Sequence, residues 1–75
     1  MKINNWFIID EYVSGRVYGH PTLMDGTLFR AKVQSLFSDG RIAFISTPSG
    51  DKYMLGEPDL YAPKDRTDLS KININ

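Results

Sequence analysis

The stretch "LFRAKVQSLFSDGRIAFIST", residues 28–47, decides the fold class. Its first half alternates along an extended chain between a largely apolar set and a set that contains both cations. The first set is Phe29, Ala31, Val33, Ser35 and Phe37, and the second is Leu28, Arg30, Lys32, Gln34 and Leu36. A period of two with charges on one side is typical of a strand that is buried on one face and solvated on the other. We therefore predict a strand over residues 28–37.

The residues that follow predict two more strands. "SDGR", residues 38–41, contains the Asp-Gly step of a tight hairpin turn. "RIAFIST", residues 41–47, is rich in the β-branched and aromatic residues that strands favour. "DKYML", residues 51–55, follows a Pro-Ser-Gly-Asp turn. These segments predict a three-stranded antiparallel meander.

The N-terminal segment "NWFIIDEYVSGRVYGH", residues 5–20, is expected to be one long extended element with a break at Ser14-Gly15. A glycine inside such a run indicates a bulge or a sharp bend. Bent long strands are the means by which small sheets close into barrels. We therefore expect this segment to pass from one half of the sheet to the other.

Downstream, Pro58 and Pro63 oppose a regular strand or a long helix. A single 3₁₀ turn that carries Leu60 and Tyr61 onto the core fits this segment best. The tail, residues 64–75, is expected to be a short closing strand, with disorder as the alternative.

The fold class predicted is all-β: a small antiparallel sheet of four to five strands, strongly bent or closed into an SH3-like barrel. Residues 1–63 form its single domain, and residues 64–75 form the tail. So many short strands need bulky core side chains, which we expect to be aromatic. The candidates are Trp6, Phe29, Phe37, Phe44, Tyr53 and Tyr61.

Composition excludes several classes of function. The chain of 75 residues has no cysteine, so neither disulfides nor a thiolate zinc site stabilise it. Nine Lys and Arg balance nine Asp and Glu, and the net charge of zero gives no basic field toward nucleic acid or anionic lipid. Asp10 interrupts the N-terminal apolar run, which argues against a signal peptide. We expect a cytoplasmic protein that binds no membrane and needs no cofactor.

His20, the single histidine, lies in "YGHPTLMDGT", residues 18–27. Catalysis by His20 would need a nucleophile or carboxylate beside it, and Asp25 is near in sequence only. One imidazole is also too few ligands for a metal site. A structural role is favoured, in which Gly19 permits an unusual backbone angle and His20 bonds a backbone group. We therefore predict neither catalytic nor metal-binding residues, and no enzymatic activity.

Arg16, Tyr18 and His20 occupy alternate positions and are expected to project from one face of a strand. With Arg30 they are the candidate residues for ligand or partner binding, by stacking on and hydrogen-bonding to a base or a peptide. The alternative is an ordinary solvated face whose aromatic residue covers the edge of the core.

Two stretches, "VYGHPTLMDGTLFRAKV" (residues 17–33) and "TPSGDKYMLGEPD" (residues 47–59), resemble a pattern in small uncharacterised proteins of bacteriophages and their bacterial hosts. The pattern has a tryptophan near the start, Gly-His-Pro before Asp-Gly, and Ser-Gly before Tyr-x-Leu-Gly-x-Pro, and it covers residues 6–60. It has Thr-Ser where this chain has Ala31 and Lys32. The resemblance implies an intracellular accessory protein that binds a host protein, such as a component of a defence system. It carries no catalytic residues to transfer.

The function expected is that of a small non-enzymatic binding module that acts by contact with a partner protein, and a homodimer through an exposed sheet edge is compatible with this. The alternative is a binder of a small nucleotide or nucleic acid around the Gly-His-Pro loop. Hydrolysis by His20 with Asp25 is a third and weaker reading.

Overall fold

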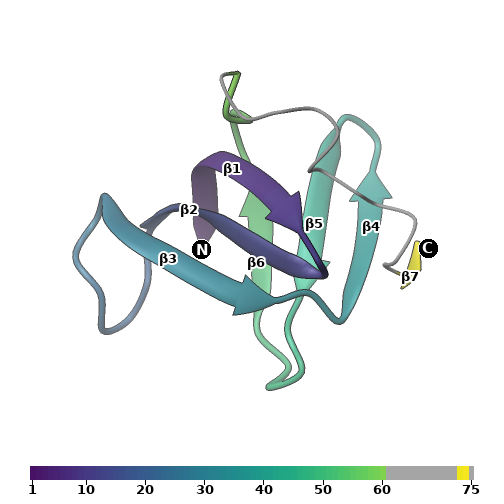
Figure 1. Ribbon diagram of the computed structural model, residues 1–75, viewed down its shortest axis with the longest axis horizontal. Coiled ribbons are helices and arrows are strands. Elements are labelled where there is room, and N and C mark those ends of the chain that lie inside the picture. The colour runs from purple at the N-terminus through teal and green to yellow at the C-terminus, as the bar shows by residue number, and fades with distance from the viewer. Residues whose placement is uncertain (61–72, 75) are drawn as a thin grey trace.

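The computed structural model describes residues 1–60 and the backbone of residues 73–74. These residues form strands and no helix (Figure 1). The strands are β1 (Lys2–Ile9), β2 (Tyr12–Tyr18), β3 (Thr27–Lys32), β4 (Ser35–Asp39), β5 (Ile42–Ser46), β6 (Lys52–Leu55) and the two-residue β7 (Asn73–Ile74). Their order in the sheet is β3-β2-β1-β6-β5-β4-β7. The all-β prediction is confirmed.

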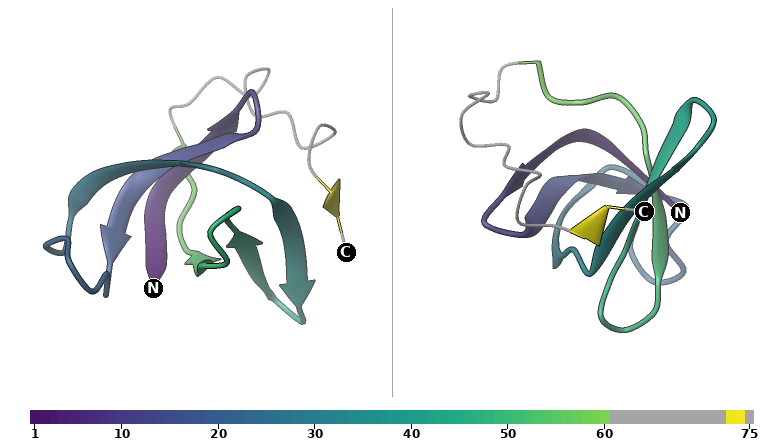
Figure 2. Two further views of the ribbon diagram at one scale, coloured as in Figure 1. Left: turned by 90° about the horizontal axis from the view of Figure 1, so that it is seen from below. Right: turned by 90° about the vertical axis from the view of Figure 1, so that its right-hand side faces the viewer.

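The predictions of four to five strands and of a closed barrel are wrong. The part of the chain that the structure describes forms an open sheet of six strands, β1 to β6, with β7 added beside β4. The sheet is mixed, because β1 pairs parallel to β6 and β4 pairs parallel to β7. Figure 2 shows how strongly the sheet is bent, with the chain passing over an arch from β3 to β4. β3 and β4 follow each other in the chain but lie toward opposite ends of the strand order, and no ladder joins them among the described residues.

The strand predicted over residues 28–37 is two strands, separated at Val33 and Gln34. The Val33 N–H donates to the Glu11 carbonyl at 2.7 Å, and the Gln34 N–H donates to the Ser46 carbonyl at 2.7 Å. One residue therefore binds the β1–β2 turn and the next binds β5. The bend also shifts the alternation by one position, since the core contact after Val33 is Leu36.

The N-terminal segment is a hairpin, not one long element, and this accounts for one of the extra strands. Asp10 and Glu11 have φ of 50° and 70°, and together they form its two-residue turn. Positive φ at both central residues gives such a turn the twist that matches the strands. The register irregularity lies in β1 between Asn4 and Phe7, where Asn5 has a φ of 52°.

The core is mainly aliphatic, which corrects the expectation of an aromatic core. Its buried residues in the described chain are Ile3, Ile8, Val13, Val17, Val33, Ile45, Tyr53 and Leu55. Trp6 and Phe29 are half-buried and pack against this cluster. Phe37 and Phe44 instead stack on each other, with ring centroids 5.5 Å apart and planes at 12°. The β-branched core residues come from β1, β2 and β5 and from Val33 between β3 and β4.

The predicted 3₁₀ turn is absent from residues 56–60, and Leu60 is 86% exposed instead of packing on the core. Tyr61, and the tail prediction for residues 64–72, lie outside the described residues. Asn73–Ile74 pairs with Ser35 and Leu36 of β4. No helix in the described chain is long and apolar enough to cross a membrane.

Candidate functional site

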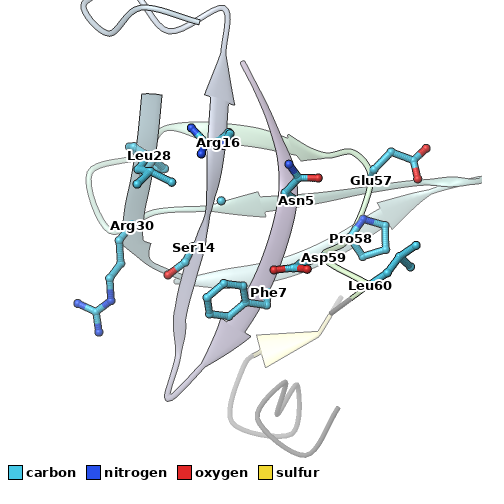
Figure 3. A pocket seen from close by; sticks show the side chains of 12 residues that line it. Asn5, Phe7, Ser14, Arg16, Leu28, Arg30, Glu57, Pro58, Asp59 and Leu60 are labelled. Atoms are coloured by element: carbon cyan, nitrogen blue, oxygen red, sulfur yellow. The ribbon is translucent and has the colours of Figure 1, made fainter. Parts of the chain in front are cut away.

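A cavity of about 760 Å³ lies on the outer face of β1, β2 and β3, opposite the core. We call it the groove. Side chains of the three strands line its floor and one side, and the segment that follows β6 forms its wall (Figure 3). The lining residues are Asn5, Phe7, Ser14, Gly15, Arg16, Leu28, Phe29, Arg30, Glu57, Pro58, Asp59 and Leu60.

The strand register positions the floor of the groove. Ser14 pairs with Arg30, and Arg16 pairs with Leu28. Because alternate side chains of a strand point to opposite faces, these four lie together on the face away from buried Val13 and Val17. Leu28 is 72% exposed there.

The wall, residues 57–60, is held by backbone bonds to the bulged part of β1. The Asp59 N–H donates to the Trp6 carbonyl at 2.8 Å, and the Glu57 N–H donates to Asn4 Oδ1 at 3.1 Å. Trp6 Nε1 donates to the Gly56 carbonyl at 2.9 Å. A Cβ on Gly56 would meet the Asn4 and Lys2 side chains, and the Asn4 amide would have to move from its position beside the Glu57 N–H. The β1 bulge therefore determines where the wall stands.

Charges on the two sides of the groove are opposite. Arg16 Nη1 donates to the Gly26 carbonyl at 2.8 Å, and the Arg30 guanidinium lies 4.1 Å from the centre of the Tyr12 ring. Both contacts restrict a cation at the surface. Glu57 and Asp59 belong to the wall on the other side. The groove thus combines exposed apolar surface with ordered charges.

His20 does not belong to the groove. Its Nδ1 accepts hydrogen bonds from the N–H groups of Thr22 and Leu23, each at 3.1 Å. Its ring lies 6.0 Å from that of Phe29 and 6.5 Å from that of buried Tyr53. The side chain therefore caps its own loop and covers one end of the core.

The β2–β3 loop uses its other polar groups in the same way. Gly19 has a φ of 72°, and its N–H donates to Asp25 Oδ1 at 2.9 Å. The carboxylate of Asp25 thus binds a backbone group of its own loop. These contacts agree with the structural role predicted for Gly19 and His20.

The candidate residues Arg16, Tyr18 and His20 do not share one face. The left-handed backbone at Gly19 ends the alternation, so His20 turns toward the core while Arg16 stays exposed. The structure instead brings Arg16 and Arg30 into one groove, and Tyr18 is not part of its lining. Leu28 and the wall were missed by sequence reasoning. An apolar residue in the polar register of a strand was the available signal for Leu28.

Among the described residues, neither the raised pKa of Tyr53 nor a metal site belongs to the groove. Burial raises the pKa of the Tyr53 phenol above its ordinary value of 10.0, and the Asp51 carboxylate raises it further. No group of three or more His, Cys, Asp or Glu side chains that could hold a metal ion occurs in the described part of the chain.

Comparisons with known proteins returned no match among family models, curated proteins or solved structures.

Proposed function

We propose that this protein is a non-enzymatic binding module that acts by occupying the surface of a partner protein, and that the groove is its contact surface. The observation that carries this proposal is the exposed Leu28 side chain between two ordered cations, Arg16 and Arg30. Arginine is enriched in protein interfaces, and the buried core of an interface is more apolar than the rest of the surface. The resemblance to phage and bacterial proteins points to a bacterial host protein as the partner.

Co-purification with tagged variants from bacterial cells tests the proposal. Leu28→Asp puts a charge into the groove, whereas Met24→Asp changes a side chain of similar size that is 84% exposed in the β2–β3 loop. We expect wild type and Met24→Asp to retain the same protein in stoichiometric amount, and Leu28→Asp to lose it while remaining folded by circular dichroism. Equal recovery with Leu28→Asp contradicts the proposal.

The alternative, a small nucleotide or nucleic acid as ligand, draws its support from the same two arginines. His20 Nδ1 and the His20 ring already make contacts within the protein, so they are less available to bind such a ligand than the sequence suggested. Salt separates the two readings. Binding to phosphates weakens steeply as salt rises, whereas a contact centred on Leu28 should weaken less, because only its charged pairs are screened. Recovery of a nucleotide in place of a protein would favour the alternative.

A further inference from the structure

The strand β3 forms one end of the sheet (Figure 1). It pairs with β2 along one side, and within the described residues no strand pairs with its other side. Such an edge presents a row of backbone N–H and C=O groups that another extended chain can pair with. At this edge the groove opens, since Leu28 and Arg30 of β3 line it.

The hydrogen-bond phase of β3 identifies the residues that face outward. The Val33 N–H binds the Glu11 carbonyl, next to the Tyr12–Lys32 pair of the ladder. Opposed residues of an antiparallel ladder alternate between bonded and non-bonded pairs. Ala31 and Phe29 are therefore bonded to β2, as Val33 is bonded to the turn.

The same alternation directs the N–H and C=O groups of Leu28, Arg30 and Lys32 away from β2. Their side chains are all exposed. Leu28, Arg30 and Lys32 thus supply both the backbone groups that point away from β2 and the exposed side chains at this edge.

Charge decides what can pair here. If two copies of β3 paired antiparallel about Arg30, the two Arg30 side chains would lie opposite each other, and like charges in that position destabilise a sheet. The same cations attract carboxylates. β3 itself carries no acidic residue. Self-pairing in this register is therefore disfavoured, and the cations favour an acidic extended chain.

We propose that an acidic, extended segment of a partner protein adds to the sheet as a strand beside β3, with carboxylates next to Arg30 and Lys32 and an apolar side chain near Leu28. This inference rests on the proposed function and specifies the partner's chemistry. Strands in a sheet lie about 4.8 Å apart, which places side chains of the added strand within reach of both cations. Backbone bonds would supply affinity, and the cations would select acidic sequences.

Titration of the ¹⁵N-labelled protein with an acetylated, amidated Glu-Val-Glu-Val-Leu peptide tests this inference, because antiparallel pairing puts its two Glu side chains beside Lys32 and Arg30 and its Leu beside Leu28. We expect millimolar peptide to shift the amide resonances of Leu28, Arg30 and Lys32 more than those of Phe29 and Ala31. The Lys-Val-Lys-Val-Leu peptide should cause no such shifts. Methylation of the peptide's backbone nitrogens on the pairing side should abolish them.

The variant Arg30→Glu/Lys32→Glu replaces two attractive cross-strand pairs by repulsive ones and should weaken binding by about tenfold or more. Arg41→Glu, at an exposed position in the β4–β5 turn, is the matched control and should change binding little. The proposal is overturned if the acidic peptide causes no shifts, if the methylated peptide binds equally, or if dilution alone moves the same resonances, which would indicate a homodimer.

The two proposals fail separately. If Leu28→Asp loses its partner protein in the co-purification but the peptide leaves β3 unaffected, the groove remains a protein-binding surface and strand addition is excluded. If the peptide binds β3 but no partner depends on Leu28, the proposed function fails.

Discussion

Gly15 lies in β2 directly across from the irregular part of β1. A Cβ at this position would come within 2.6 Å of Ile3 Cγ2 and 2.7 Å of the Asn4 carbonyl oxygen. The second contact is with backbone, which yields less readily than a side chain. The break predicted at Ser14-Gly15 is wrong, because β2 runs through this position as one strand and the bulge lies opposite it in β1. No local pattern could reveal an irregularity in the neighbouring strand.

Gly15→Ala should therefore lower the free energy of unfolding by about 1–3 kcal/mol, the usual cost of forcing an extra methyl group into a packed site. Urea denaturation measures this change. Ser38→Ala, at an exposed position in β4, is the control and should stay within about 0.5 kcal/mol of wild type. A Gly15→Ala protein as stable as wild type would show that the two strands are not in close contact here.

His20→Ala should destabilise the protein, because two loop N–H groups lose their acceptor and the Phe29 and Tyr53 rings lose a neighbour. We expect a loss of about 1–3 kcal/mol. In His20→Asn the side-chain oxygen can take the place of Nδ1, as in an Asx turn, so this variant should lose less. Thermal unfolding of both variants measures the difference. Equal losses would mean that the hydrogen bonds contribute nothing.

Tyr53 predicts a dependence of stability on pH. Burial and Asp51 raise its pKa in the folded protein, so the unfolded chain loses the phenol proton first as the pH rises. Below the unfolded pKa of about 10 the phenol is neutral in both states, so its ionisation does not change the free energy of unfolding. Above that pH the unfolded chain ionises first, and the free energy of unfolding should fall. Urea denaturation between about pH 8 and pH 11 should show a smaller fall for Tyr53→Phe. Identical pH profiles would contradict the raised pKa.

At the scale of elements, most strands could be predicted and their connections could not. Period-two alternation and the Asp-Gly turn identified the extended residues of β3, β4 and β5, because these signals are local, but they merged β3 and β4 into one strand. The reversal at Asp10 and Glu11 contains no glycine, so the usual signal of a two-residue hairpin turn is missing there. The bend at Val33 follows from its bond to the β1–β2 turn, a contact between distant segments.

The β1–β2 turn offers a test of this explanation. Glu11 has a φ of 70°, which side chains other than glycine adopt at a cost. Glu11→Gly creates the Asp-Gly pair favoured in such turns and keeps the carbonyl that binds Val33. We expect an increase of about 0.5–1 kcal/mol in the free energy of unfolding, measured by urea denaturation. A decrease would indicate that the turn has another conformation.

At the scale of the whole molecule, the groove depends on contacts between distant segments, which local sequence patterns do not predict. Arg30 was a candidate from its place on the polar face of a strand, and Arg16 from alternation with Tyr18. The residues on the opposite side of the groove belong to the wall, residues 57–60, which is more than twenty-five positions away in the chain. Hydrogen bonds between β1 and residues 56–59, together with the pairing of β1 and β6, bring these segments together.

The proposal of strand addition depends on β3 being an edge that no strand of the described chain other than β2 pairs with. Hydrogen exchange of the unbound protein, followed by NMR at single amides, tests this most directly. We predict fast exchange at Leu28, Arg30 and Lys32 and slow exchange at Phe29, Ala31 and Val33. Slow exchange at all six amides would contradict the account, because another strand would then already occupy this edge.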